Sequence, residues 1–294
     1  MNLQSTRTLV NGVEMPIFGL GVYKMTDPQE TIEAITKALQ VGYRAIDTAS
    51  LYYNEEQVGE AIRHSGVARE EIFVTTKVWN TDQGYDNTLK AFEVSLKKLN
   101  MDYVDLYLTH WPVEGKYPDT YRAIERLYEE KLIRVPGVSN HHAHHLEQLL
   151  HSANVPPMVN QVEAHPYLSQ EPLRTFCREH HIAVTAWSPL GRGGVLQDET
   201  IIKIAEKYGK SAAQVVLRWH LQHNILVIPK SVTPSRIEEN ANIFDFVLSS
   251  EDSPEKNLIL YQDQQNINKI YSCLEKLNDK QKEVIKGRFF QNPP

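Results

Sequence analysis

Short apolar runs alternate along the chain with longer segments in which apolar residues recur every three to four positions. Apolar runs of four to seven residues are typical of buried strands, and the wider spacing is typical of amphipathic helices. In the segment 26–40, Ile32, Ile35, Ala38 and Leu39 fall at helical spacing. The chain therefore predicts a regular alternation of strands and helices, which favours parallel strands joined by helical connections.

Eight strands are predicted in this alternation. They cover residues 17–21, 42–48, 72–78, 104–110, 133–139, 158–164, 182–187 and 225–229. The predicted helices cover residues 26–40, 55–63, 87–99, 119–131, 143–151, 171–180, 199–208 and 211–221. Asn54 precedes the second helix, where its side chain is expected to cap the first amides. Asn11-Gly12 lies between two short arms before the first strand and favours a type I′ turn, which predicts an N-terminal hairpin.

The number of strands indicates how the sheet is built. Eight parallel strands with short connections are the number at which a sheet closes into a barrel, whereas a doubly wound sheet more often has about six. The glycine fingerprint of dinucleotide-binding sheets is incomplete, because Gly19-Leu20-Gly21 lacks the third glycine. We therefore predict a (β/α)8 TIM barrel with an N-terminal β-hairpin over residues 1–250.

Composition and charge narrow the class of protein. The 294 residues are 41% hydrophobic, which by itself would suit one large barrel or two smaller domains. The net charge of -6 argues against a surface for nucleic acid or for an anionic membrane. No apolar run approaches the ~18 residues of a membrane helix, and the first residues do not form a signal peptide. Cys177 and Cys273 lie far apart and match no metal spacing, so we expect a reducing compartment and a cytoplasmic protein. We also expect a monomer.

Polar residues end three successive predicted strands. Asp47 ends the second strand, Lys77 the third and His110 the fourth, while Tyr52 follows in the loop after Asp47. Singly, a strand-end lysine or histidine is more often structural, but active sites of (β/α)8 barrels lie at these strand ends. A buried carboxylate needs a partner, so Asp47 is expected to hold Lys77. Lys77 is expected to favour the phenolate of Tyr52 and so to make it a better acid.

At these residues the chain resembles the aldo-keto reductases, and most closely the prokaryotic members that reduce small aldehydes and keto-sugars. The resemblance rests on GYRAIDTASLYYNEEQVG at 42–59, TKVW at 76–79, DLYLTHWP at 105–112, GVSN at 137–140, NQVEAHPY at 160–167, WSPLGRGG at 187–194 and VIPKSVTPSRIEEN at 227–240. It implies that Asp47, Tyr52, Lys77 and His110 are the catalytic tetrad. It also implies a nicotinamide cofactor that lies extended across the top of the barrel.

The candidate cofactor residues follow the last four strands. Amide and hydroxyl side chains after strands five and six suit the carboxamide of nicotinamide, and an indole after strand seven suits stacking on its ring. The glycine-rich loop 188–194 allows close approach of a pyrophosphate, and the cations after strand eight suit a 2′-phosphate, which favours NADPH over NADH. The full set is Ser139, Asn140, Gln161, Trp187, Ser188, Leu190, Gly191, Lys230, Ser231, Val232, Arg236, Glu239 and Asn240. The resemblance alone places the last two beside the adenine.

The expected substrate pocket is aromatic. Tyr23, Trp79 and Trp111 follow strands one, three and four, and His110 lies among them. Such walls suit small aldehydes, ketoaldehydes or keto-sugars. The predicted reaction is NADPH-dependent reduction of a carbonyl to an alcohol by hydride transfer, with Tyr52 as the general acid. An NADPH-binding redox-sensing or interaction subunit with little turnover is the alternative.

Two segments depart from the family pattern. The run HHAHH at 141–145 has a spacing that suits a metal, but no carboxylate or cysteine nearby completes a ligand set. We interpret it as a solvated helix start and expect no metal. Residues 251–294 predict a helical C-terminal extension. Two roles stay open for it: a helical pair that packs on the outside of the barrel, or a segment that binds a partner protein. Its segment LEKLNDKQKEVIKGRFF is faintly similar to the promoter-binding region of bacterial sigma factors but lacks the helix-turn-helix that reads DNA.

Overall fold

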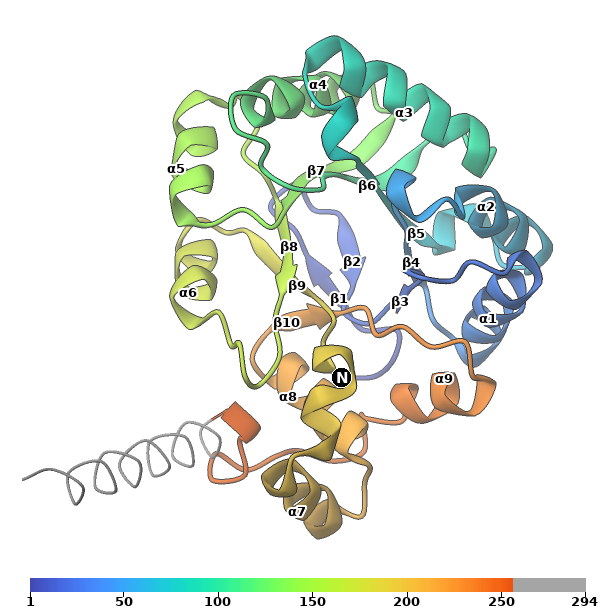
Figure 1. Cartoon of the computed structure of the whole chain (residues 1–294), viewed down its shortest axis with the longest axis vertical. Helices are drawn as coiled ribbons and strands as arrows, with labels where there is room; N and C mark the ends of the chain where they lie inside the picture. The colour runs from blue at the N-terminus through green and yellow to red at the C-terminus, as the bar shows by residue number, and fades with distance from the viewer. Residues whose placement is uncertain (256–294) are drawn as a thin grey trace, which may run out of the picture.

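The computed structural model describes residues 1–255, which form a barrel of strands surrounded by helices (Figure 1). The barrel strands are β3 (Leu20–Gly21), β4 (Ala45–Asp47), β5 (Phe73–Val78), β6 (Val104–Thr109), β7 (Ile133–Ser139), β8 (Val159–Glu163), β9 (Ala183–Trp187) and β10 (Ile225–Val227). The helices are α1 (Pro28–Val41), α2 (Glu55–His64), α3 (Tyr85–Leu99), α4 (Tyr117–Glu129), α5 (Ala143–Ser152), α6 (Glu171–Glu179), α7 (Glu199–Tyr208), α8 (Ala212–Gln222) and α9 (Pro234–Ala241). Short 3-10 helices are η1 (Ser50–Tyr52), η2 (Arg69–Glu71), η3 (Asn80–Asp82) and η4 (Gly191–Gln197). The predicted alternation is confirmed, with ends that differ by a few residues.

Neighbouring barrel strands are parallel and follow the order β3 to β10 around the sheet. The register places Lys77 of β5 beside Leu108 of β6. The sheet closes between its first and last strands, because Phe18 and Val227 form a parallel bridge. The amide of Gly19 also donates to the carbonyl of Val227 at 2.9 Å. The expected (β/α)8 barrel is therefore confirmed, and all strand ends that carry the candidate site lie at one end of it.

Local sequence explains how the helices start, stop and pack. The side chain of Asp27 caps α1 by accepting a first-turn amide at 2.8 Å, and Gly42 ends the helix in a left-handed conformation. Strands β5 and β6 are buried along their whole length, as expected for strands with side chains on both the barrel interior and the surrounding helices. Helix α2 approaches the end of α3 so closely that a Cβ on Gly59 would lie 2.0 Å from the carbonyl oxygen of Leu99. Only glycine allows this contact.

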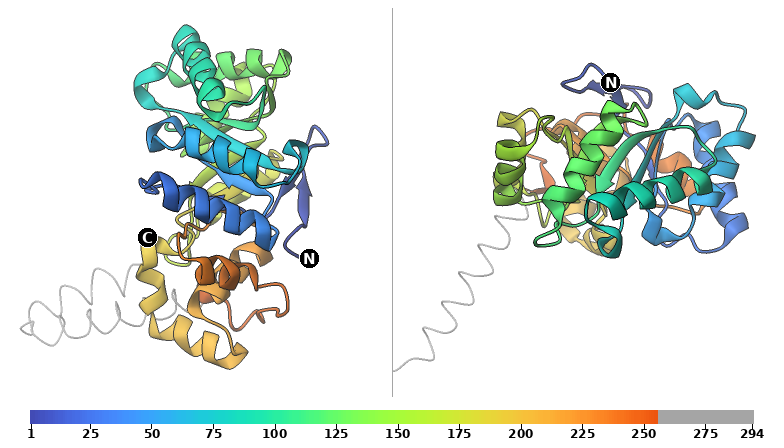
Figure 2. Two further views of the ribbon diagram at one scale, coloured as in Figure 1. Left: turned by 90° about the vertical axis from the view of Figure 1, so that its right-hand side faces the viewer. Right: turned by 90° about the horizontal axis from the view of Figure 1, so that it is seen from above.

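The predicted N-terminal hairpin consists of β1 (Thr6–Thr8) and β2 (Glu14–Pro16), and it lies across one end of the barrel (Figures 1 and 2). The expected type I′ turn is wrong, because Gly12 has a φ of 81° but Asn11 is not left-handed. The Asn11 side chain instead donates to the carbonyl of Arg134 at 3.0 Å. This contact ties the turn to the start of β7.

Other sequence expectations concern segments outside the barrel strands. Among residues 1–255, no helix is long and apolar enough to cross a membrane. The predicted helical extension at 251–294, with its sigma-factor-like segment, lies outside the described residues from position 256 onward. Helix α9 was implied by the alternation but not bounded from the sequence, although Thr233-Pro234 forms its N-cap and first position.

Candidate active site

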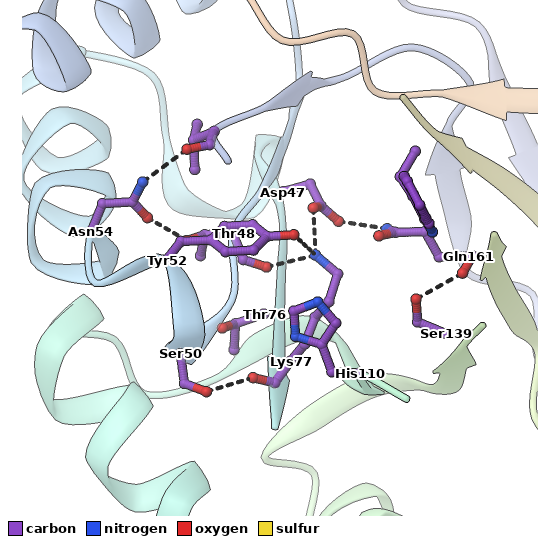
Figure 3. A network of polar contacts seen from close by, with 12 residues as sticks. Asp47, Thr48, Ser50, Tyr52, Asn54, Thr76, Lys77, His110, Ser139 and Gln161 are labelled. Carbon is purple, nitrogen blue, oxygen red and sulfur yellow. Dashed lines mark hydrogen bonds and ion pairs between the residues drawn. The ribbon is translucent and has the colours of Figure 1, made fainter. Parts of the chain in front are cut away.

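The four residues expected to form the tetrad lie together at the carboxyl ends of β4, β5 and β6 (Figure 3). Asp47 is the last residue of β4, Tyr52 ends η1, Lys77 lies near the end of β5 and His110 follows β6. The Nζ atom of Lys77 lies 2.5 Å from Oδ1 of Asp47 and 3.5 Å from the Tyr52 oxygen. The rings of Tyr52 and His110 are 5.8 Å apart between centroids. Side chains from the ends of three strands therefore lie around the phenol of Tyr52.

The ammonium group of Lys77 is buried and has a complete set of partners. It donates to Asp47, to the backbone oxygen of Thr48 at 2.8 Å and, over a longer contact, to the oxygen of Tyr52. An ammonium has three N–H donors, so this set satisfies the group. Because the Tyr52 oxygen accepts from Lys77, the phenolic hydrogen can point away from the lysine toward a ligand.

The loop that carries Tyr52 is held by Asn54. Asn54 occupies the N-cap position of α2 as expected, but its side chain makes no hydrogen bond to the helix, so the capping prediction is wrong. Its Nδ2 donates to the carbonyls of Val22 at 2.9 Å and Met25 at 3.2 Å, and its Oδ1 accepts from the hydroxyl of Thr48 at 2.7 Å. The buried amide therefore joins the loops after β3 and β4.

A second hydroxyl fixes the short helix η1 over β5. The hydroxyl of Ser50 donates to the backbone oxygen of Lys77 at 3.0 Å. Tyr53 then ends η1 in a left-handed conformation, with a φ of 55°. Sequence reasoning missed these anchors, although the signal was present as small polar residues on both sides of Tyr52.

Burial sets the acidity of the phenol. Removal from water raises the pKa of Tyr52 above its ordinary value, and the ammonium of Lys77 offsets only part of this effect. Lys77 by itself lowers the pKa of Tyr52, as expected. The net pKa of Tyr52 is nevertheless raised, so the expectation of a more acidic phenol is wrong. Burial also acts to lower the pKa of Lys77, but Asp47 and Tyr52 more than reverse it, and the pKa of Lys77 is raised. Both groups are protonated at neutral pH.

His110 is neutral at the same pH. Burial, and then the charge of Lys77, lower the pKa of His110 to about 3. Its Nδ1 is buried and has no hydrogen-bond partner within residues 1–255. The ring lies edge-on to Trp79, with centroids 5.0 Å apart. A neutral imidazole carries one N–H donor, so His110 can orient a ligand oxygen without adding charge.

The side-chain amide of Gln161 donates a hydrogen bond to Asp47, although the sequence suggested that it would bind the cofactor. Its Nε2 donates to Oδ2 of Asp47 at 2.6 Å, the oxygen that Lys77 does not use (Figure 3). The hydroxyl of Ser139 donates to the backbone oxygen of Gln161 at 2.7 Å. Ser139 is the last residue of β7, as expected, whereas Gln161 lies in the middle of β8, and the sequence did not show that Gln161 holds the carboxylate.

Asn140 links three strand ends. Its Nδ2 donates to the backbone oxygen of His110 at 2.9 Å, and its Oδ1 accepts from the indole of Trp187 at 2.8 Å. Asn140 has a φ of 60°, a left-handed conformation that asparagine tolerates better than most residues. Trp187 is thereby oriented at the end of β9, next to the residues expected to meet the nicotinamide.

The loop 188–194 has an open backbone. Gly191 and Gly193 are left-handed, with φ values of 53° and 90°, as are Ser188 and Arg192. A Cβ at Gly193 would meet nothing within 4 Å. Leu190 is partly buried against the core and anchors the loop. The backbone at Gly193 is therefore open to a close approach of a phosphate, whereas a Cβ at Gly191 would lie 3.0 Å from the Val195 side chain.

Two free cations lie between the end of β10 and the first turn of α9. The side chains of Lys230 and Arg236 are exposed, and neither has a hydrogen-bond or ion-pair partner in the part of the chain that the structure describes. Arg236 lies in the first turn of α9, where the helix end adds partial positive charge. Ser231 is buried and accepts from the amide of Thr233 at 3.2 Å. The arrangement fits a phosphate group.

The other residues expected around the adenine lie on the same helix or directly before it. Val232 is partly buried before α9. Glu239 is exposed on the helix and Asn240 is buried. All three lie within one short segment with the cations, so the expected adenine and 2′-phosphate positions are neighbours.

The aromatic residues expected to meet the substrate divide into two groups. The ring of Tyr23 lies 4.9 Å from that of Tyr52 between centroids, and Trp79 contacts His110. These two rings border the catalytic pair directly. Trp111 is 42% exposed and has its backbone oxygen held by Gln83, so it lies at the rim.

The histidine run is only partly a solvated helix start. His142 and His144 are exposed, as interpreted, but His141 is fully buried and that interpretation is wrong for it. Its Nδ1 lies 2.8 Å from the backbone oxygen of Ser139, and burial lowers its pKa to about 3. The His141 ring packs edge-on against Tyr117, with ring centroids 5.4 Å apart. Within residues 1–255, no group of three or more His, Cys, Asp or Glu could hold a metal ion.

Comparison with known proteins agrees with this geometry. Glyoxal reductase of Bacillus subtilis (strain 168) is 57% identical over 251 residues, which cover 85% of this chain and 91% of that protein. The 9,11-endoperoxide prostaglandin H2 reductase of Trypanosoma cruzi (strain CL Brener) is 54% identical over 248 residues, which cover 83% and 88%.

A solved structure and a family match extend the comparison. The crystal structure of a Gox0644 mutant in complex with NADPH is 46% identical, covers 86% of this chain and 93% of its own, and has a TM-score of 0.82. Residues 17–257 match the Aldo/keto reductase family, a span that contains every barrel strand and each candidate residue above. The chain therefore belongs to the aldo-keto reductase family.

Proposed function

We propose that the protein reduces small aldehydes, ketoaldehydes or keto-sugars to alcohols with NADPH. The observation that carries the proposal is the buried Asp47–Lys77 pair, which contacts the phenol of Tyr52 beside a neutral His110. The relative named glyoxal reductase supports a small dicarbonyl substrate. The bordering rings of Tyr23 and Trp79 support a substrate with little bulk.

The residues present fit NADPH at several points. Lys230 and Arg236 are the free cations at a helix start that a 2′-phosphate requires, and the open backbone of 188–194 suits the pyrophosphate. Trp187, oriented by Asn140, offers a flat surface for the nicotinamide ring. When bound, the cofactor would supply a hydride to the carbonyl carbon. The relative crystallised with NADPH supports this assignment.

The protein's own groups would handle the proton. Tyr52 and His110 would both hydrogen-bond the carbonyl oxygen, and Tyr52 would give its proton to that oxygen as it gains negative charge. An alkoxide is a far stronger base than a phenolate, so the transfer is favourable although burial raises the pKa of Tyr52. Lys77 would stabilise the resulting phenolate, while Asp47 holds Lys77 and Gln161 holds Asp47.

NADPH oxidation against a small carbonyl panel tests the proposal. We expect saturable turnover with methylglyoxal and with a nitrobenzaldehyde. The loss of NADPH absorbance measures this turnover. Tight NADPH binding without turnover of any panel member would contradict the enzyme assignment and favour the redox-sensing subunit. No contact within residues 1–255 favours that alternative specifically.

We further propose that the protein acts as a cytoplasmic monomer whose residues 1–250 hold all cofactor and catalytic groups. The support is that every residue of the candidate site comes from one barrel, and that Cys177 is a free, buried thiol. Light scattering on the full chain checks the monomer. Turnover and stability of the full chain, compared with those of a chain that ends at residue 250, test the role of residues 251–294.

Removing Arg236 should separate the two nicotinamide cofactors. We expect Arg236→Ala to raise the KM for NADPH by about tenfold to a hundredfold, because a charge-assisted hydrogen bond to phosphate is lost. The KM for NADH should hardly change, since NADH lacks the 2′-phosphate. Arg122→Ala, at an exposed arginine on α4 that pairs with Asp119, is the matched control. Equal weakening of both cofactors would remove the assignment of Arg236.

The pH dependence of reduction should be flat where histidines ordinarily titrate. His110 has a pKa of about 3 and stays neutral above that value, while the pKa of Tyr52 is raised and its phenol stays protonated at neutral pH. We therefore expect kcat/KM for reduction to change little from about pH 5 to 8. The rate profile measures this directly. An inflection near the ordinary histidine pKa that persists in His142→Gln, an exposed control, would contradict the expected flat profile.

A further inference from the structure

A cavity of about 520 Å³ lies at the amino-terminal ends of the barrel strands, away from the candidate active site. Ile17, Val184 and Ile225 line it, and these residues precede or begin β3, β9 and β10. The tetrad occupies the opposite, carboxyl ends of the strands. The hairpin lies across this end of the barrel (Figure 2), and its residues Thr6 and Arg7 line the cavity.

Three arginines line the cavity. Arg7 comes from β1 of the hairpin, and Arg174 and Arg178 come from successive turns of α6. Among the described residues, no aspartate or glutamate lines it. Positive charge is therefore concentrated there, on a chain whose net charge is -6.

Backbone contacts fix two of these guanidinium groups to one short loop. The Nη1 of Arg7 donates to the carbonyl of Asn224 at 3.2 Å, and the Nη2 of Arg174 donates to the carbonyl of His223 at 3.4 Å. These carbonyls belong to consecutive residues between α8 and β10. Arg178 lies one turn along α6 from Arg174, where its Nη2 donates to the hydroxyl of Thr175 at 3.0 Å.

The charges in this cluster are not fully compensated. Arg174 forms an ion pair with Glu171 at 2.8 Å. Arg7 and Arg178 have no carboxylate partner within residues 1–255. Arg7 is half-buried, and this burial lowers its pKa. A guanidinium has five N–H donors, and the hydrogen bonds of Arg7 and Arg178 use only part of them. Neighbouring cations repel each other, so an anion between them would be stabilising.

The rest of the cavity wall combines an aliphatic surface with the polar residues Ser5, Thr6, His223 and Asn224. Ile182, Leu221 and Leu226 line it together with the residues at the strand starts. The volume lies in the range of small-molecule sites. An inorganic ion would satisfy the arginines but would leave this apolar surface facing water, whereas an organic anion covers both.

We propose that this cavity is a second binding site, for a small organic anion whose carboxylate or phosphate group bonds to Arg7 and Arg178 and whose apolar part lies on the isoleucine and leucine surface. The planar guanidinium groups bind either headgroup through paired hydrogen bonds. The site is independent of the proposed function, because it shares no residue with the tetrad or with the cofactor residues.

Calorimetric titration of the full chain tests the site. Phenyl phosphate and phthalate serve as anionic probes, with inorganic phosphate and neutral benzyl alcohol as comparisons. Excess NADP⁺ is present throughout to fill the cationic surface at α9. We expect saturable binding of at least one organic anion, weaker binding of inorganic phosphate and none of benzyl alcohol. The tighter of the two organic probes identifies the headgroup as phosphate or carboxylate.

Single substitutions then locate the bound probe. Arg178→Gln should weaken the affinity for the organic anion by about tenfold to a hundredfold. Arg178 is exposed on α6, so this substitution should not disturb folding. Arg122→Gln, at an exposed ion pair, and Arg236→Ala, in the cofactor surface, should leave the affinity unchanged. Absence of saturable binding for both organic anions would overturn the proposal. Equal affinity in Arg178→Gln, a loss in Arg236→Ala, or inorganic phosphate bound as tightly as phenyl phosphate would also overturn it.

Discussion

Tyr52→Phe should lower kcat for carbonyl reduction by about 10² to 10⁴-fold while leaving NADPH affinity unchanged. The substitution removes only the hydroxyl that contacts Lys77 and that would protonate the substrate oxygen. The ring keeps its contacts with Tyr23 and His110, so the pocket should retain its shape. A loss in kcat without a loss in cofactor binding is the signature of a group needed in the transition state.

Steady-state kinetics with methylglyoxal, together with a fluorescence titration of NADPH, measure the two quantities. Tyr53→Phe is the matched control, since Tyr53 is the next residue and 81% exposed. The control should turn over normally. Unchanged turnover in Tyr52→Phe would remove it as the general acid, and an equal loss in Tyr53→Phe would show that the loop itself had been damaged.

The position of the tetrad could be predicted from the sequence because the barrel imposes it. Parallel strands place all their carboxyl ends on one face, so Asp47, Lys77 and His110 had to come together once the strands were identified. The pairing of Asp47 with Lys77 followed from the cost of burying a lone charge.

Side-chain partners across the barrel could not be predicted in this way. Asn54 satisfies local rules for a helix cap, yet its amide bonds to carbonyls of another loop, a choice that only tertiary packing decides. Gln161 lies 114 residues from Asp47 in sequence, and no local pattern links them. The acidity of Tyr52 depended on how deeply the ring is buried, which the sequence does not show.

The contacts of Asp47 and Lys77 imply that these candidate catalytic residues also affect the stability of the fold. Lys77 is 1% exposed and Asp47 5% exposed at the side chain, and their ion pair crosses from β5 to β4. A buried ion pair adds little net stability compared with apolar residues, but breaking it leaves an uncompensated charge. The same pair should therefore affect folding and turnover by different routes, which substitutions can separate.

Lys77→Met should lower the free energy of unfolding by about 3 to 5 kcal/mol and also abolish most turnover. Without the ammonium, the Asp47 carboxylate keeps Gln161 as its side-chain partner among the described residues but has no opposite charge. Adding Asp47→Asn removes that stranded charge. The double variant should therefore recover most of the lost stability and remain inactive, because the phenolate of Tyr52 is no longer stabilised.

Urea unfolding and kcat, measured on both variants, separate the two effects. Arg126→Met is the matched control, since it breaks the exposed pair with Glu130 and should change stability by no more than about 1 kcal/mol. If Lys77→Met lowered the free energy of unfolding by no more than Arg126→Met does, the buried ion pair would not be important for stability. If the double variant regained turnover together with stability, Lys77 would be a structural residue, and the proton transfer from Tyr52 would have to proceed without it.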